Sequence, residues 1–244
     1  MKIKFDEASH TYTHTETKQN LVSVTTLLGK YKAPFDSDKH SKRVAAREGV
    51  PQELVLEMWE TEKNRACDRG TNIHAVLEDY INYGHVEDNY GWLCKSYDKA
   101  VERSIDPFTE VLSENLLYNE FHLVAGTADL IYEHKGGEFT IGDFKTNKKF
   151  RFSSPYGERL KEPINHLHSC EFNTYGMQLS MYAYLYEKMS GKKCRKCVIF
   201  YLNEDRFLSY HINYMRAEVK TLLEHHSTTR GEYCVKSLLT KQKS

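Results

Sequence analysis

The clearest pattern in the chain is a pair of largely apolar runs that flank two glycines. Residues 121–132 and 138–145 each predict a β-strand. Lys135-Gly136-Gly137 lies between them and supplies residues that adopt positive φ at little cost, as a hairpin turn requires. The pattern therefore predicts an antiparallel hairpin.

Charged side chains gather at one end of this predicted hairpin. Asp129 interrupts the first run, and Asp143-Phe144-Lys145 ends the second. A turn centred between the two glycines would place Asp129 opposite Phe144, and the two-residue side-chain period puts Asp143 and Lys145 on one face. An Asp-x-Lys alone is most often a solvated pair. A carboxylate in an apolar run, however, needs a cation or a hydrogen-bond partner, and two such acids beside a lysine suit metal-assisted phosphodiester hydrolysis.

A helix predicted further along the chain carries two polar side chains on one face. Residues 175–186 repeat apolar positions at three- and four-residue spacing, which places Gln178 and Tyr182 one turn apart. Their amide and phenol can hydrogen-bond phosphate or base edges. Standing alone, such a pair is ordinary helix surface.

Two upstream segments add a histidine and a further acid. Residues 69–80 predict the opening of a helix, with Thr71 as N-cap and His74 in its first turn. A histidine there is a possible metal ligand, although a lone histidine more often packs or caps. Residues 110–118 predict a strand that carries Glu114, for which the alternative is an ordinary exposed acid.

The remaining segments complete a mixed α/β pattern. Residues 148–172 form a long polar loop, which is either a gate over the site or an unpacked insert. Residues 9–28 predict a hairpin that feeds a short helix capped by Ser23. The other predicted elements are a helical stretch at 36–83 that carries Trp59, a strand at 198–202, an edge strand at 206–214, and a helix at 216–226 with Val219, Leu222 and Leu223 inward.

The formal net charge of the 244 residues is zero, which argues against a uniformly basic surface. Nucleic-acid binding therefore requires local basic patches. Lys148, Lys149 and Arg151 follow the strand that ends at Lys145 and are placed to contact phosphates. A second basic run at residues 188–196 is more simply a solvated surface.

These pieces, in this order, resemble the PD-(D/E)XK nuclease superfamily, specifically its RecB-like exonuclease branch. The resemblance spans roughly residues 65 to 202. The matching motifs are Gly70-Thr71 with His74, Ser113-Glu114, Gly126-Thr127-Ala128-Asp129, Asp143-Phe144-Lys145-Thr146, and Gln178 four residues before Tyr182. The segment from Ser9 to Leu28 adds a weaker similarity to the start of phage and bacterial proteins of this branch.

The resemblance implies a role for each matching position. His74, Asp129, Asp143 and the backbone carbonyl of Phe144 look like metal ligands, and Lys145 looks like the catalytic lysine. Glu114 is similar to a helper carboxylate that also serves catalysis. The residues implied to contact DNA are Gln178, Tyr182, Thr146, Lys148, Lys149 and Arg151. Carboxylate ligands suit one or two Mg²⁺ or Mn²⁺ ions, and an imidazole ligand shifts the balance toward manganese.

Some members of this family carry an iron–sulfur cluster, which requires four thiolates brought together. Among the six cysteines, Cys194 and Cys197 form a Cys-x-x-Cys in a predicted basic turn, and Cys234 is distant in sequence. This spacing favours reduced thiols over a cluster or a structural zinc. No signal peptide and no run of about 20 apolar residues is apparent, so the sequence predicts a cytoplasmic protein without a membrane partner.

The sequence thus predicts an α/β (α+β) protein with a restriction-endonuclease-like core, a central mixed sheet flanked by helices, an N-terminal hairpin and a helical insertion. Residues 1–244 form one predicted nuclease domain, divided into a hairpin and helical cap at 1–65, a catalytic core at 66–215, and a helix and tail at 216–244. The predicted activity is metal-dependent exonucleolytic hydrolysis of DNA ends or single strands in phage or bacterial recombination, repair or replication, with a protein of those processes as a possible partner. The alternatives are a nucleic-acid-binding module without catalysis and a structure-specific or sequence-specific endonuclease.

Overall fold

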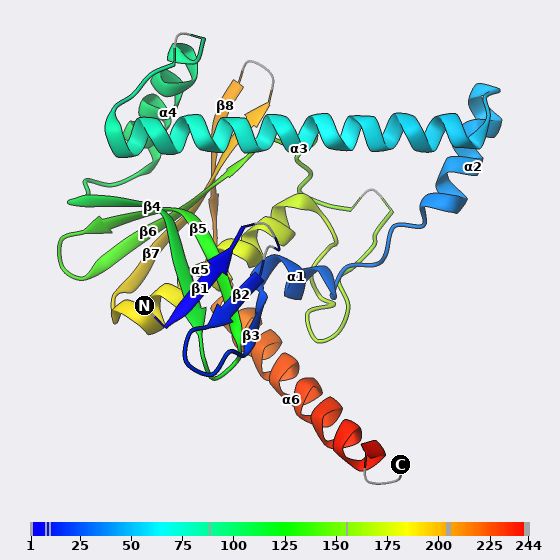
Figure 1. Ribbon diagram of the computed structural model, residues 1–244. Coiled ribbons are helices and arrows are strands. Elements are labelled where there is room, and N and C mark those ends of the chain that lie inside the picture. Colours follow the sequence, from blue (N-terminus) through cyan, green and yellow to red (C-terminus); the bar gives the residue numbers. More distant parts are fainter. Residues whose placement is uncertain are drawn as a thin grey trace.

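The fold is described from a computed structural model that covers residues 2–7, 9, 11–87, 89–154, 156–203 and 206–241, with side chains up to residue 230. Figure 1 shows a central β-sheet with helices on both of its faces. The predicted mixed α/β core is therefore confirmed. The predicted tail beyond residue 241 and the side chain of Cys234 lie outside the described residues.

Within the described residues, eight strands form one mixed sheet. The pairs β3–β5 and β6–β7 are parallel, and the other strand pairs are antiparallel. In spatial order the strands are β1 (Ile3–Asp6), β2 (Thr11–His14), β3 (Asn20–Ser23), β5 (Val124–His134), β6 (Glu138–Lys145), β7 (Lys193–Asn203) and β8 (Arg206–Ile212), while β4 (Glu110–Asn119) pairs with β5.

Two apolar clusters fix the helices against the sheet. One face packs against α3 (Gln52–Tyr83) and α4 (Gly91–Ser104). The other face packs against α1 (Val24–Gly29), α5 (Glu171–Ser190) and α6 (Arg216–Lys241). The predicted Ser23 cap is confirmed, because its side chain accepts a hydrogen bond from the backbone N–H of Thr26. The predicted inward residues of α6 (Val219, Leu222 and Leu223) are fully buried. Among the described residues, no helix has the length and apolarity that a membrane crossing requires.

The β5–β6 hairpin differs from its prediction by one residue in register. Gly136 and Gly137 both have positive φ, as predicted. The paired residues next to the turn are His134 and Glu138, so the turn has three residues and centres on Gly136. Continuation of this register places Asp129 opposite Asp143 rather than opposite Phe144. The first strand also begins later than predicted, at Val124, because residues 120–123 form a turn.

The predicted helix start at Thr71 is wrong. Helix α3 runs without interruption from Gln52 to Tyr83, so Thr71 lies inside it and His74 is nearer its C-terminal end. Gly70 has a packing role instead: a β-carbon there would lie 3.2 Å from Oγ1 of Thr146, the residue that follows β6. The glycine therefore lets the helix approach the strand end that carries Lys145.

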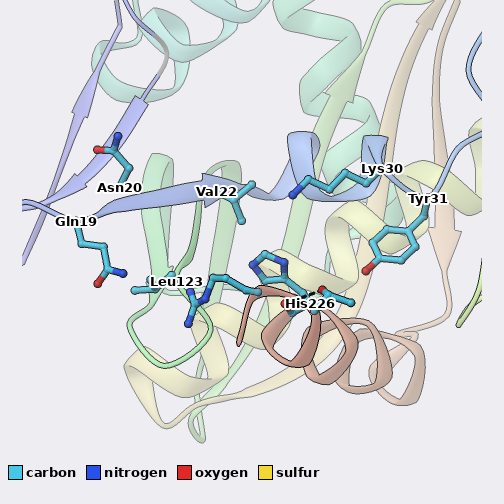
Figure 2. Close-up of a pocket in the computed structure, with 9 residues that line it drawn as sticks. Gln19, Asn20, Val22, Lys30, Tyr31, Leu123 and His226 are labelled. Atoms are coloured by element: carbon cyan, nitrogen blue, oxygen red, sulfur yellow. Dashed lines mark hydrogen bonds between the residues drawn. The ribbon is translucent and has the colours of Figure 1, made fainter. Parts of the chain in front are cut away.

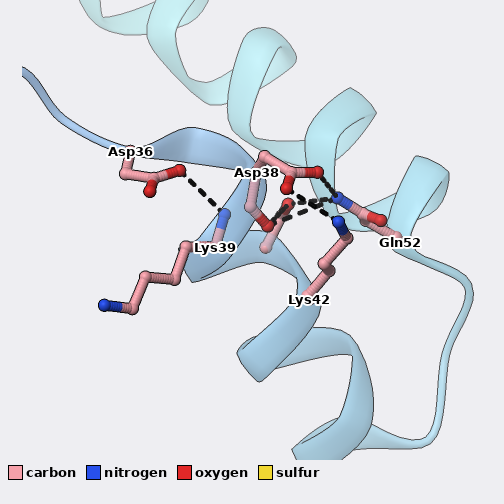
Figure 3. A network of polar contacts seen from close by, with 6 residues as sticks. Asp36, Asp38, Lys39, Lys42 and Gln52 are labelled. Atoms are coloured by element: carbon pink, nitrogen blue, oxygen red, sulfur yellow. Dashed lines mark hydrogen bonds and ion pairs between the residues drawn. The ribbon is translucent and has the colours of Figure 1, made fainter.

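Helix α2 (Ser37–Glu48) meets the beginning of α3 at a polar elbow, shown in Figure 3. Asp36 caps α2 by accepting a hydrogen bond from the backbone N–H of Lys39. The Gln52 amide donates to Asp38 at 3.0 Å and to Ser41 at 2.9 Å. Figure 1 shows the first part of α3 and α2 extending beyond the edge of the sheet. The predicted helical stretch at 36–83 is thus confirmed as two helices.

The long loop that leads to α5 is anchored in the core. Leu160 and Ile164 are buried in the same apolar cluster as α5. The backbone N–H of Lys161 donates to the carbonyl of Tyr31 at 2.8 Å. These contacts decide against an unpacked insert.

The Cys-x-x-Cys motif does not lie in a turn. Cys194 and Cys197 are both in β7, which begins at Lys193. The register of β7 against β6 shifts after Cys194, and this irregularity brings the two Sγ atoms to 3.8 Å. Sequence spacing alone does not reveal a bulge of this kind.

Candidate metal centre

The candidate site lies where β5 changes neighbours. Along one of its two sides, β5 pairs first with β3, through Val124 and Ala125, and then with β6, from Leu130 onward. Residues 126–129 lie between these two paired segments and have no partner in β3 or β6. The same stretch carries Asp129, and the end of β6 carries Asp143 and Lys145.

On its other side β5 pairs with β4, and there Asp129 faces a second acid, Glu114. The strand pairs on either side of this position are Ser113 with Leu130 and Asn115 with Ala128, so Glu114 stands opposite Asp129. Glu114 has a φ of 44°, in the left-handed region that non-glycine residues rarely occupy. Such strain is often kept at functional sites.

The charges of these acids are costly where they stand. Burial and the neighbouring Asp143 carboxylate raise the pKa of Asp129 to about 6. Loss of surrounding solvent, followed by the charge of Asp129, raises the pKa of Glu114 to about 7, although its side chain still reaches solvent. A divalent cation would relieve both penalties.

His74 joins the two acids from α3. Its Nδ1 is 3.4 Å from Oδ2 of Asp129, and its Nε2 is 3.2 Å from the carbonyl oxygen of Phe144. His74, Glu114 and Asp129 each offer one ligand atom, and these atoms lie within 4.8 Å of one another. Glu114, which the sequence offered only as a helper, is thus part of the geometric ligand group, whereas Asp143 is not in it.

Asp143 is instead tied to Lys145 and Gln178. Its side chain is only 1% exposed, with Oδ2 ion-paired to the Lys145 ammonium. Gln178 Nε2 donates to Oδ1 of Asp143 at 3.2 Å and to the Tyr182 hydroxyl at 3.3 Å. The predicted Gln178–Tyr182 pair therefore acts on the site from α5. The Lys145 ammonium also lies over the ring of Tyr175, 4.9 Å from its centroid, a contact the sequence did not indicate.

Lys145 is held in its charged form. Burial alone would lower the pKa of Lys145, but the adjacent Asp143 and Asp129 carboxylates outweigh it and raise the pKa above its ordinary value. Lys145 can therefore stabilise negative charge, and it is a poor proton acceptor.

A cleft of about 900 Å³ opens onto the ligand group. Its walls come from β1, the C-terminal half of α3 and the paired strands β4 and β5, through Glu114, Leu116 and Thr127. Glu78 also lines it, one turn after His74 on the same helix, and its charge contributes to the raised pKa of Glu114. Sequence reasoning missed Glu78, although its four-residue spacing from His74 is a readable signal.

Gly126 allows α5 to pack closely against β5. A β-carbon at this position would lie 2.6 Å from Cε1 of Tyr182 and 3.3 Å from Cγ2 of Val24. The absence of a side chain lets the Tyr182 ring reach the strand and brings Gln178 toward Asp143.

Four of the predicted DNA-contacting residues follow β6, and their side chains differ in whether they are already paired. Lys148 is ion-paired with Glu62 on α3, Arg151 lies 3.5 Å from Glu171, and Lys149 is exposed. These residues and Thr146 follow the end of β6 that carries the site.

The second basic run is at the other end of the sheet, because β7 begins beside Glu138, where β6 begins. There Lys192, Arg195 and Lys196 pair with the acids Glu133, Glu138 and Asp106, as a surface charge run does.

The comparisons with known proteins find distant likenesses in structure. No family model and no curated protein matches the chain. Among solved structures, the protein is similar to SSO0001, with 16% identity, a TM-score of 0.41, and coverage of 86% of this chain and 76% of that chain. It is also similar to a candidate exonuclease from Eubacterium rectale, with 9% identity, a TM-score of 0.35, and coverage of 84% and 68%. Because both likenesses are this distant, function has to be inferred from the site itself.

Proposed function

We propose that the protein is a metal-dependent deoxyribonuclease of the PD-(D/E)XK type, in the RecB-like exonuclease branch. The proposal rests on one observation: Asp129, Asp143 and Lys145 lie together where β5 changes its neighbour from β3 to β6. His74 and Glu114 lie beside them. A buried cluster of acids with a single ammonium is electrostatically unfavourable unless it serves a charged ligand.

The residues present fit a hard divalent cation. Glu114, Asp129 and the Phe144 carbonyl offer oxygen atoms, and His74 offers one nitrogen. Oxygen-rich sets suit Mg²⁺, and the imidazole makes Mn²⁺ equally suitable. Burial and the neighbouring carboxylates raise the pKa values of Asp129 and Glu114, and a bound cation would lower both. Asp143 stands one strand away, opposite Asp129, and serves as a further ligand if its link to Lys145 is exchanged.

When bound, such a cation would polarise the scissile phosphate and favour deprotonation of a bound water. The chain's own residues would do the rest. Lys145, kept protonated by its two acids, donates hydrogen bonds to charge that develops on the phosphate. Gln178 holds the Asp143 carboxylate in position, and the Tyr175 ring packs against the lysine. In this scheme Lys145 is an electrostatic group and not a base.

The proposed substrate is DNA, as single strands or duplex ends. The cleft of about 900 Å³ is bordered by the exposed residues Lys4 and Thr71, and the exposed residues Lys149 and Arg151 follow β6 in the sequence. Phosphate contacts from such residues position a strand without reading its sequence. We also propose a cytoplasmic role in recombination, repair or replication, with one nuclease domain over residues 1–244.

The test is digestion of 5′- and 3′-labelled single- and double-stranded oligonucleotides, and of circular DNA, with Mg²⁺, Mn²⁺ or EDTA. We expect metal-dependent cleavage from ends that falls on the order of 100-fold or more in Lys145→Met and Asp143→Asn. Lys99→Met, on the exposed surface of α4, is the matched control and should retain full activity. Cleavage that survives EDTA or Lys145→Met refutes the mechanism. DNA binding without cleavage would instead indicate a binding module, and cutting of circular strands an endonuclease.

A further inference from the structure

A second cavity shares no lining residue with the cleft at the metal centre and contains the cationic side chains of Lys30 and Arg230. It has a volume of about 600 Å³ and lies among β3, the end of α1 and α6. Figure 2 shows the Lys30 side chain and the His226 ring turned toward the same space. The described residues that line it are Gln19, Asn20, Val22, Lys30, Tyr31, Leu123, His226, Thr229 and Arg230, and none of them is a carboxylate.

The cationic groups in this cavity have donors to spare. Arg230 gives one hydrogen bond to a described residue, from Nη1 to the His122 carbonyl at 3.3 Å, out of the five N–H donors of its guanidinium. The Lys30 ammonium has no hydrogen bond or ion pair with any residue in the described part of the chain. Their positive charges therefore meet no acid among the described residues that line the cavity.

His226 is the least satisfied group there. It is only 7% exposed, and its Nε2 has no hydrogen-bond partner among the described residues. Burial, Lys30 and Arg230 together lower the pKa of His226 to about 4. The His226 ring lines the cavity beside the two cations, and an anionic ligand there would offset the repulsion between Lys30 and Arg230.

The rest of the lining fits an organic body attached to that anion. Val22, Leu123 and the ring of Tyr31 give an apolar surface. The Asn20 side-chain oxygen accepts a hydrogen bond from the Thr13 hydroxyl, and its amide N–H groups make no hydrogen bond to another described residue. The volume lies within the range of about 300–1,000 Å³ typical of small-ligand sites and exceeds what a lone inorganic anion needs.

We propose that this cavity binds a phosphate-bearing ligand of nucleotide size, with the phosphate held by Lys30 and Arg230 beside the His226 ring. The ligand is either a free nucleoside monophosphate or the phosphorylated end of a DNA strand, since both present the same group. The site is separate from the metal centre and does not depend on the nuclease proposal.

Calorimetric titration in phosphate-free buffer with EDTA tests this site, with Asp143→Asn as the parent so that no strand is cut. The probes are deoxyadenosine 5′-monophosphate, deoxyadenosine, and one oligonucleotide with and without a 5′-phosphate. We expect one saturable site for the monophosphate, at least about tenfold weaker binding of the nucleoside, and a loss of about tenfold or more in Lys30→Gln and in Arg230→Gln. Preference for the phosphorylated oligonucleotide over the monophosphate would identify the strand end as the source.

Lys30 is exposed, so Lys30→Gln should fold normally, and Lys99→Gln on α4 is the control that should bind like the parent. The proposal is overturned if neither the monophosphate nor the phosphorylated strand saturates. It is also overturned if Lys30→Gln binds both as the parent does, or if deoxyadenosine binds as well as its monophosphate. Because every titration contains EDTA and lacks turnover, a failed nuclease assay does not affect the result.

Discussion

Glu114 and Asp129 stand opposite each other on β4 and β5, so two carboxylates occupy one cross-strand position. Like charges at such a position destabilise a sheet. A neutral replacement of Glu114 would remove this repulsion. We therefore interpret the pair as a cation-binding site, because a bound cation would offset the electrostatic repulsion between the two carboxylates.

This arrangement predicts opposite effects of Glu114→Gln on stability and on binding. At about pH 8 Glu114 is charged, because its pKa is raised only to about 7. Removal of that charge should stabilise the metal-free protein by about 1 kcal/mol and weaken Mn²⁺ binding on the order of tenfold or more. Thermal unfolding with EDTA and Mn²⁺ titration measure the two effects. Glu102→Gln, exposed on α4, should change neither; a less stable Glu114→Gln protein would contradict the account.

Gly126→Ala should disturb the site through packing alone. The new methyl group would meet the Tyr182 ring at 2.6 Å, so we expect a loss of about 1–3 kcal/mol in unfolding free energy and lower activity. Gly29→Ala is the matched control, since nothing lies within 4 Å of its β-carbon. Chemical denaturation measures both variants. In a Tyr182→Leu background the cost of Gly126→Ala should shrink, and an unchanged cost would remove Tyr182 from the explanation.

The loop between β6 and α5 should contribute to global stability. Ile164 is fully buried, so Ile164→Ala should cost about 2–5 kcal/mol and increase protease cutting within the loop. Tyr156 in the same loop is 85% exposed, and Tyr156→Ala should change stability by less than about 0.5 kcal/mol. Urea unfolding with limited proteolysis checks the pair. Equal, small effects would mean that the loop does not pack on the core in solution.

His226 should make the protein sensitive to acid. Its pKa is about 4 in the folded chain, whereas in the unfolded chain it returns to its ordinary 6.5. Between pH 6.5 and about 4, the unfolded state binds a proton at His226 that the folded state does not. The contribution of neutral His226 to the free energy of unfolding is therefore full above pH 6.5. It declines by up to about 3 kcal/mol as the pH falls toward 4.

Urea titrations in phosphate-free buffers across this range measure the effect. His226→Gln should flatten the decline, while the exposed control His166→Gln should leave it unchanged. A decline of the same size in His226→Gln would assign the acid sensitivity to other groups.

Local pattern was sufficient for several elements. The run at 138–145 matches β6 residue for residue, and the predicted helix at 175–186 lies within α5. The cap at Ser23 was also readable. Each of these depends on neighbours within about four residues in sequence, and backbone geometry makes such signals visible in the residue types themselves. Helix α4 (Gly91–Ser104) was not predicted at all.

The sequence by itself determined which chemistry the chain carries: the acids, the lysine, the histidine and the two strands that hold most of them. Only the tertiary structure decided their geometry. It continued α3 through Gly70, shifted the hairpin by one residue so that Asp129 opposes Asp143, and set Glu114 against Asp129. Strand register and helix continuation depend on contacts between segments far apart in the chain, and a one-residue change in register alters which side chains meet.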